Sequence, residues 1–166
     1  AKKRIFRDRT GGGQVAVIGV DDAHGAAMAD EIAARGDWRV IRVSSQRSVE
    51  NGIYAVDGKL FDNLVENGGA ARLVCDLTTV TTLPGAHNWQ NAVACYSVAR
   101  VLDLKPDDIA EKLATYPGLA HRQETVDRIS GILYVNDSKA TNPDAASRAL
   151  GSYEVIYWIA GGRAKD

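Results

Sequence analysis

The stretch QVAVIGVDDAHGAAMADEIAARGDWRVIRVS, residues 14–44, decides the fold of this chain. Residues 14–20 are a short β-branched run that predicts a buried strand, and residues 21–35 follow as a helix that Gly36 ends. Residues 39–44 supply the next strand. A strand, a helix and a strand in this order form a βαβ unit, so the pattern predicts an α/β fold with a mostly parallel sheet.

The sheet is predicted to continue beyond this unit. Residues 52–63 alternate apolar and polar side chains around Asp57 and Gly58, a pair typical of a two-residue hairpin turn. Residues 71–80 extend the strand-rich region.

Two helices follow. The apolar residues of HNWQNAVACYSVARVL, residues 87–102, recur at helical spacing. Pro106 and two acids then begin a second helix, which Pro117 and Gly118 end. We place a domain boundary here, between residues 1–117 and residues 118–166.

The second domain is predicted to begin with a β-hairpin, because two β-rich runs flank Ser130 and Gly131. The register of such a hairpin sets Arg122 opposite Lys139, and it sets Glu124 opposite Asp137. Two cations side by side are unfavourable unless an anion lies between them, so this register favours a phosphate or carboxylate ligand. The alternative is that the two acids neutralise the cations.

After the hairpin, Asn142 and Pro143 predict the start of a helix over residues 143–150. The run VIYWIAGG, residues 155–162, predicts a buried strand. A domain of this length is too small to bury a stable core alone.

The composition restricts the class of protein. The 166 residues are 45% apolar, with 20 basic and 21 acidic side chains, so the chain is globular and has no overall field that favours nucleic acid or a membrane. Cys75 and Cys95 lie in apolar stretches without CxxC spacing, which indicates core thiols and a reducing compartment. We therefore expect a cytoplasmic protein. A start at Ala1 and an end just after an apolar run suggest a piece of something larger.

Polar residues gather in VNDSKATNPDAASRAL, residues 135–150, between a strand end and a helix start. Ligands of open α/β sheets bind at such places. Lys139 offers a charge to an anion, and Asp137 can accept hydrogen bonds from sugar hydroxyls. The alternative is a polar loop with a solvated lysine.

A further candidate site is HNWQN, where Asn88 and Asn91 share one face of the first helical turn. Amide side chains donate and accept at once, which suits the edge of an adenine ring. The alternative is that one asparagine caps the helix. His87 and His121 lack ligand-spaced partners, so we expect no metal site.

Four ordered motifs, LPGAHNWQNAVA, YPGLAHRQE, VNDSKATNPDAASRAL and IAGGRAKD, resemble the Mur ligases of peptidoglycan synthesis. The resemblance covers the whole chain and is strongest over residues 83–166. It implies that residues 1–117 are the second half of a central ATPase domain, and that residues 118–166 begin a Rossmann-like C-terminal domain. The form NDSKATN favours the branch of the family that adds D-glutamate.

The resemblance also implies a reaction: ATP-dependent addition of D-glutamate to UDP-N-acetylmuramoyl-L-alanine through an acyl phosphate. ATP and Mg²⁺ are the implied cofactors, with the metal ligands outside this chain. The implied whole protein is a cytoplasmic monomer, and this piece alone is expected to have no turnover.

Site residues follow from the motifs. Asn88 and Asn91 would face the adenine, and Lys139 and Lys165 are the implied catalytic residues, of which Lys139 would meet phosphate or carboxylate oxygens. The remaining implied contacts are His121, Arg122 and Asp137 with the nucleotide, and Thr141 and Lys165 with D-glutamate. One departure from the family is Ala120, where a proline is usual.

Three other functions stay open at this point. The chain could belong to another ligase of the superfamily, such as a folylpolyglutamate synthase. It could be a non-catalytic module that binds adenosine or an anion, or an α/β scaffold for protein contacts.

Overall fold

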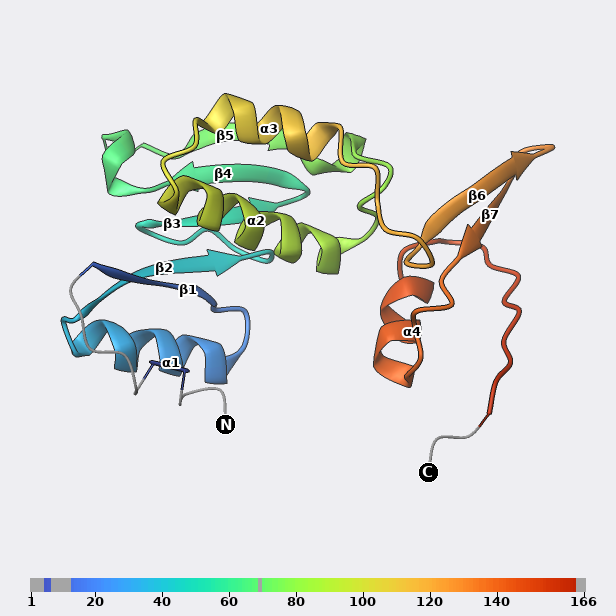
Figure 1. Cartoon of the computed structure of the whole chain (residues 1–166), viewed down its shortest axis with the longest axis horizontal. Helices are drawn as coiled ribbons and strands as arrows, with labels where there is room; N and C mark the ends of the chain where they lie inside the picture. The colour runs from blue at the N-terminus through green and yellow to red at the C-terminus, as the bar shows by residue number, and fades with distance from the viewer. Residues whose placement is uncertain (1–4, 7–12, 69, 164–166) are drawn as a thin grey trace. The chain divides into compact units, whose positions relative to one another are not determined.

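The computed structural model describes residues 5–6, 13–68 and 70–163. The chain forms two compact units, with the division between Gly118 and Leu119. Figure 1 shows the elements of each unit, which are described separately below.

The first unit is built on a five-stranded sheet with the order β1-β2-β3-β4-β5. β1, β2 and β3 are parallel, and β4 is antiparallel to both of its neighbours. The sheet is therefore mixed but mostly parallel, which confirms the predicted α/β class. The strands are β1 (Gln14–Gly19), β2 (Trp38–Ser44), β3 (Gly52–Val56), β4 (Lys59–Asn63) and β5 (Arg72–Asp76).

Helix α1 (Ala23–Ala34) connects β1 to β2 and completes the predicted βαβ unit. Asp22 caps its first turn, since the carboxylate accepts hydrogen bonds from the backbone N–H groups of His24 and Gly25 at 2.9 Å each. Gly25 also permits a close approach to the strand end, because a Cβ there would lie 2.1 Å from the Gly19 carbonyl oxygen.

Helices cover both faces of this sheet, giving three layers (Figure 1). Helices α2 (Ala86–Val101) and α3 (Pro106–Ala114) pack on one face, and α1 packs on the other. None of the helices in the described part of the chain is long and apolar enough to cross a membrane. The first core includes Ile41, Ile53, Leu60, Val93 and Leu113, and the second includes Ile18, Ala29, Ile32, Val40 and Tyr54.

The fully buried carboxylate of Asp62 on β4 links the sheet to α2 by hydrogen bonds. Its Oδ2 accepts hydrogen bonds from the Tyr96 hydroxyl at 2.8 Å and from the Arg100 Nε at 2.9 Å. Its Oδ1 accepts the backbone N–H of Leu64 at 3.1 Å. The charge is therefore paired inside the unit, which is the condition for a buried carboxylate to be tolerated.

The turn between β3 and β4 has the predicted form. Asp57 and Gly58 have φ values of 50° and 74°, as a two-residue turn that follows the twist of the strands requires. Short 3₁₀ turns, η2 (Val65–Asn67) and η3 (Leu77–Thr79), flank β5.

The second unit contains the predicted hairpin of β6 (Glu124–Ile129) and β7 (Ile132–Asn136), followed by helix α4 (Pro143–Leu150). The hairpin turn is formed by Ser130 and Gly131, both at positive φ. Asn142 caps α4, because its Oδ1 accepts the backbone N–H of Ala145 at 2.8 Å.

The predicted register of this hairpin is wrong at the site end. Ile129 pairs with Ile132 as expected, but a bulge at Val126 shifts the rest of the ladder by one residue. Glu124 consequently lies opposite Asn136 and not opposite Asp137. Arg122 and Lys139 are not cross-strand neighbours, so the argument that their paired charges require an anion fails.

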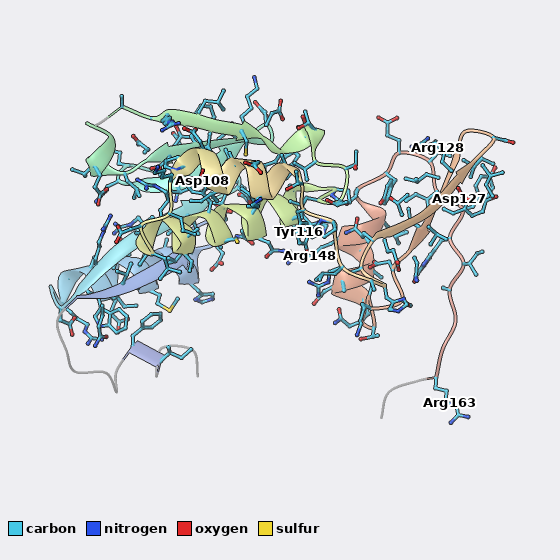
Figure 2. All side chains as sticks on the ribbon, turned by 45° about the horizontal axis from the view of Figure 1, so that its top comes forward. Asp108, Tyr116, Asp127, Arg128, Arg148 and Arg163 are labelled. Atoms are coloured by element: carbon cyan, nitrogen blue, oxygen red, sulfur yellow. The ribbon has the colours of Figure 1, made fainter. Side chains whose placement is uncertain are left out.

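The predicted strand over residues 155–162 is also absent. This segment has no regular structure in the second unit, and Trp158 and Ile159 are 64% and 97% exposed. A strand needs a neighbour for its backbone hydrogen bonds, and none of the described strands pairs with this segment. Figure 2 shows Arg163 on the same irregular segment.

The prediction that both cysteines are core thiols holds only in part. Cys75 is half-buried, but Cys95 is exposed. Cys95 lies on α2, whose buried positions include Ala92, Val93 and Tyr96, and it falls on the other side of the helix.

Candidate functional site

The loop that opens the second unit, residues 119–123, has an unusual backbone. His121 and Gln123 adopt left-handed conformations with φ values of 64° and 44°. Two carboxylates hold this shape: Glu124 Oε2 accepts the His121 N–H at 2.8 Å, and Asp137 Oδ1 accepts the Gln123 N–H at 3.0 Å. Such strain in residues other than glycine is found disproportionately at functional sites.

The end of β7 supplies a second set of contacts to this loop. The Asn136 Nδ2 lies 2.9 Å from His121 Nδ1 and 3.2 Å from Glu124 Oε2. The Asn136 Oδ1 accepts the N–H of Ser138 at 3.2 Å. Because of the bulge at Val126, Asn136 occupies the place opposite Glu124 where the sequence predicted Asp137.

The loop after β7 brings Lys139 beside His121 through the backbone. The Lys139 N–H donates to the His121 carbonyl at 2.9 Å, and the Ala140 N–H donates to the Asp137 carbonyl at 2.9 Å. His121, Asp137 and Lys139, which the sequence analysis singled out, are thus gathered in one place. Thr141 follows in the same turn, with its N–H 2.9 Å from the Lys139 carbonyl oxygen.

The two cations of this region are available to an anion. The side chains of Arg122 and Lys139 are exposed, and neither forms an ion pair with any residue that the structure describes. Exposed, unpaired cations beside a rigid loop can neutralise phosphate or carboxylate oxygens.

Asp137 also influences Tyr153, which follows α4. Burial, and secondarily the negative charge of Asp137, raise the pKa of the Tyr153 hydroxyl. Asp137 therefore accepts a hydrogen bond from the Gln123 backbone N–H and also affects the Tyr153 hydroxyl through its charge. Figure 2 shows Arg148 on α4, which is the helix between Asp137 and Tyr153 in the chain.

In the first unit, Asn88 lies in the first turn of α2 as predicted, and Asn91 follows in the second turn. The Asn88 Nδ2 donates to the Pro84 carbonyl at 2.7 Å, and Asn91 is exposed. The alternative that an asparagine caps this helix is wrong, because Gly85 is the N-cap residue and no side chain caps the first turn.

A polar cluster that the sequence analysis missed lies beside this turn, at the carboxyl ends of β1 and β2. Asp21 Oδ2 accepts hydrogen bonds from the Ser45 N–H at 2.9 Å and from Gln90 Nε2 at 3.3 Å. Ser44 Oγ donates to the other oxygen of Asp21. The signal in the sequence was the pair of acids directly after the first strand, at the edge where ligands of α/β sheets bind.

Two predictions about the site remain untested. The first is the role of Lys165, which lies outside the described residues. The second is that the chain holds no metal site; the described residues contain no group of three or more His, Cys, Asp or Glu side chains arranged to hold a metal ion.

Comparison with known proteins finds relatives that share one name. No family model matches the chain. It is 49% identical over 166 residues to the UDP-N-acetylmuramoylalanine–D-glutamate ligase of Paramagnetospirillum magneticum, a match that covers 100% of the chain and 34% of the relative. The chain is similar to a segment of this ligase.

Further relatives bear the same name. The ligase of Phenylobacterium zucineum is 47% identical over 165 residues, and that of Caulobacter vibrioides is 46% identical over 165 residues. Each match covers 99% of the chain and 34% of the relative. The chain therefore spans about a third of the length of the curated relatives it matches.

A solved structure with a related fold is the UDP-N-acetylmuramoylalanyl-D-glutamyl-2,6-diaminopimelate–D-alanyl-D-alanyl ligase of Acinetobacter baumannii. The TM-score is 0.59 at 20% identity, and the match covers 93% of the chain and 33% of that structure. At this level of identity the likeness concerns the fold.

Proposed function

We propose that this chain is part of an ATP-dependent amide ligase that adds D-glutamate to UDP-N-acetylmuramoyl-L-alanine. The observation that carries the proposal is the match of the whole chain, at 49% identity, to a protein of that name. Within the ligase, residues 1–117 would be the second half of the central ATP-binding domain. Residues 118–166 would begin the C-terminal domain.

The residues of the second unit fit a nucleotide. Arg122 and Lys139 offer two exposed cations to phosphate oxygens, and neither is neutralised by a described residue. The Asp137 carboxylate uses Oδ1 for the Gln123 N–H, which leaves Oδ2 to accept from ribose hydroxyls. His121 adds a ring that is about half exposed, at 55%.

The role that we assign to Asn88 and Asn91 is recognition of the adenine edge. Asn88 commits one N–H to the Pro84 carbonyl, so its Oδ1 can still accept from an exocyclic amine. Asn91 is exposed three residues further along α2 and retains both of its polar atoms.

The chemistry that ATP supplies when bound is phosphorylation of the substrate carboxylate, and the amine of D-glutamate then attacks the acyl phosphate. Phosphoryl transfer depends on positioning and charge neutralisation more than on covalent catalysis. We assign neutralisation of the transferring oxygens to Lys139, and contacts with D-glutamate to Thr141 and Lys165. Mg²⁺ is usually held by only one or two carboxylates together with substrate phosphates, and we place its ligands elsewhere in the longer protein.

The setting follows from the proposed substrates. A nucleotide-linked sugar precursor and free ATP are soluble metabolites of the cytoplasm, so we place the whole protein there, as a monomer. Its partners would be UDP-N-acetylmuramoyl-L-alanine, D-glutamate and ATP, with no nucleic acid or membrane contact.

The test is phosphate release by the longer protein that contains this chain. Release should require both UDP-N-acetylmuramoyl-L-alanine and D-glutamate in addition to ATP. Lys139→Ala should lower kcat by about 100- to 1000-fold, since removing a charge stabiliser of the transition state costs about 2.7–4 kcal/mol. Lys112→Ala is the matched control, because Lys112 is exposed on α3 and its ion pair among the described residues is with the neighbouring Glu111.

Two results would contradict the proposal. One is phosphate release with a folate and L-glutamate in place of the two substrates. The other is equal activity of the Lys139 and Lys112 variants, which would remove Lys139 from the reaction and leave a solvated lysine in a polar loop.

A further inference from the structure

The orientation of the Asn136 side-chain amide is determined by two neighbours. The atom that faces the Ser138 N–H at 3.2 Å must be the oxygen, because a backbone N–H only donates. The atom that faces Glu124 Oε2 at 3.2 Å must be the nitrogen, because a carboxylate only accepts. A flipped amide would lose both hydrogen bonds, so the assignment of Nδ2 and Oδ1 follows from the partners.

This orientation decides where the proton of His121 lies. The Asn136 Nδ2 is 2.9 Å from His121 Nδ1, and an amide nitrogen can donate a hydrogen bond but cannot accept one. Nδ1 must therefore accept and carries no proton itself. In a neutral imidazole the proton is then on Nε2.

The neighbouring carboxylate does not compete for this position. Glu124 Oε2 lies 3.7 Å from His121 Nδ1, beyond hydrogen-bonding distance. The same oxygen already accepts the His121 backbone N–H at 2.8 Å and the Asn136 amide. Glu124 thus holds both the backbone of His121 and the amide that faces its ring.

We propose that Asn136, held by Glu124, is a positioning residue that keeps His121 in the Nε2–H form, so that the ring donates a hydrogen bond to an acceptor atom of the nucleotide. The acceptor would be an oxygen or a ring nitrogen, and a donor group of the ligand would be rejected. None of the described residues hydrogen-bonds to Nε2, and the ring is 55% exposed, so this N–H is available. The nucleotide part rests on the proposed function, and the tautomer does not.

The tautomer is measured by ¹⁵N NMR of the histidine rings in the 166-residue chain, well above the ordinary histidine pKa of about 6.5. Comparison with His121→Gln assigns the signal among the 3 histidines. We expect the Nε2–H form to predominate. A predominant Nδ1–H form, or equal populations, would overturn the proposal without any further variant.

Two variants carry the same chemical change at different places. Asn136→Asp replaces the donor to Nδ1 with an acceptor, so the ring should shift toward the Nδ1–H form. Asn142→Asp is the control, since aspartate caps a helix as well as asparagine does and α4 should be retained. An unchanged tautomer in Asn136→Asp would show that this amide does not set the proton position.

The ligand part is tested in the longer protein. Loss of one donated hydrogen bond should raise the KM for ATP by about two- to twelvefold in Asn136→Asp, with kcat little changed. Asn142→Asp should leave both constants unchanged. If the tautomer shifts but the KM for ATP does not, His121 does not donate to the nucleotide. If phosphate release needs neither proposed substrate, the proposed function fails while the tautomer result stands.

Discussion

Substitution of Asp62 gives the sharpest test of what holds the first unit together. Asp62→Ala removes a carboxylate whose acceptor atoms, within the described part of the chain, bind the Tyr96 hydroxyl, the Arg100 Nε and the Leu64 N–H. Asp62 and Tyr96 are both 0% exposed, so water cannot replace the carboxylate at the hydroxyl. The change therefore leaves buried donors unsatisfied rather than exchanging one partner for another.

The expected loss is large. Breaking a buried ion pair by removal of one partner costs about 3–5 kcal/mol. The Arg100 side chain is 18% exposed and also donates to the Leu104 carbonyl at 3.2 Å, so part of its charge keeps a partner. We therefore expect the lower end, about 3 kcal/mol. Asp62→Asn retains an acceptor oxygen but loses the charge, and should cost about 1.5–3 kcal/mol.

The assay is urea unfolding of the 166-residue chain, followed by tryptophan fluorescence in a Trp158→Phe background. Trp38 and Trp89 then report the first unit alone. The control is Asp30→Ala, which breaks an ion pair whose Arg42 Nη2 and Asp30 Oδ1 atoms are 2.8 Å apart. The Asp30 side chain is 73% exposed. Exposed pairs contribute about 0–1 kcal/mol, so this control should change the free energy of unfolding little. Equal losses for the two alanine variants would refute the reasoning.

Two further predictions concern stability. Burial, followed by the hydrogen bond to Asp62 and its charge, raises the pKa of Tyr96, so the folded chain binds this proton more tightly than the unfolded chain. The resulting stabilisation is complete below the ordinary tyrosine pKa of about 10 and is lost as the pH rises above that value. Tyr96→Phe should therefore weaken the fall of the free energy of unfolding with pH above pH about 10. Asn142→Ala removes the cap of α4 and should destabilise this helix by about 0.5–2 kcal/mol, seen as faster amide exchange within it. Exchange as slow as in the unaltered chain would show that the cap contributes nothing.

Local patterns in the sequence were enough to predict most of the first unit. The β-branched runs around α1, the Asp57–Gly58 turn and the Pro106 helix start depend on residues close together in the chain, and all were confirmed. The buried network was not predictable, because Asp62 meets Tyr96 and Arg100 across 34 and 38 positions.

Several residues of the candidate site in the second unit were named from the sequence, but their arrangement was not predictable. Arg122 and Lys139 were expected to lie opposite each other in the hairpin ladder, but a bulge at Val126 breaks that register. Lys139 instead donates a backbone hydrogen bond to His121, which the loop places at positive φ. Bulges and left-handed conformations of residues other than glycine depend on tertiary partners, here Glu124 and Asp137, and leave no periodic signal in the sequence.

The proposed function is that an enzyme containing this chain joins D-glutamate to a nucleotide-linked acceptor. The most direct measurement is mass spectrometry of the product formed by the longer protein from ATP and UDP-N-acetylmuramoyl-L-alanine. The reaction is supplied with equal amounts of deuterated D-glutamate and unlabelled L-glutamate. We expect one product whose mass increases by one deuterated glutamyl residue. Incorporation of the unlabelled L-isomer, or no product from this acceptor, would contradict it.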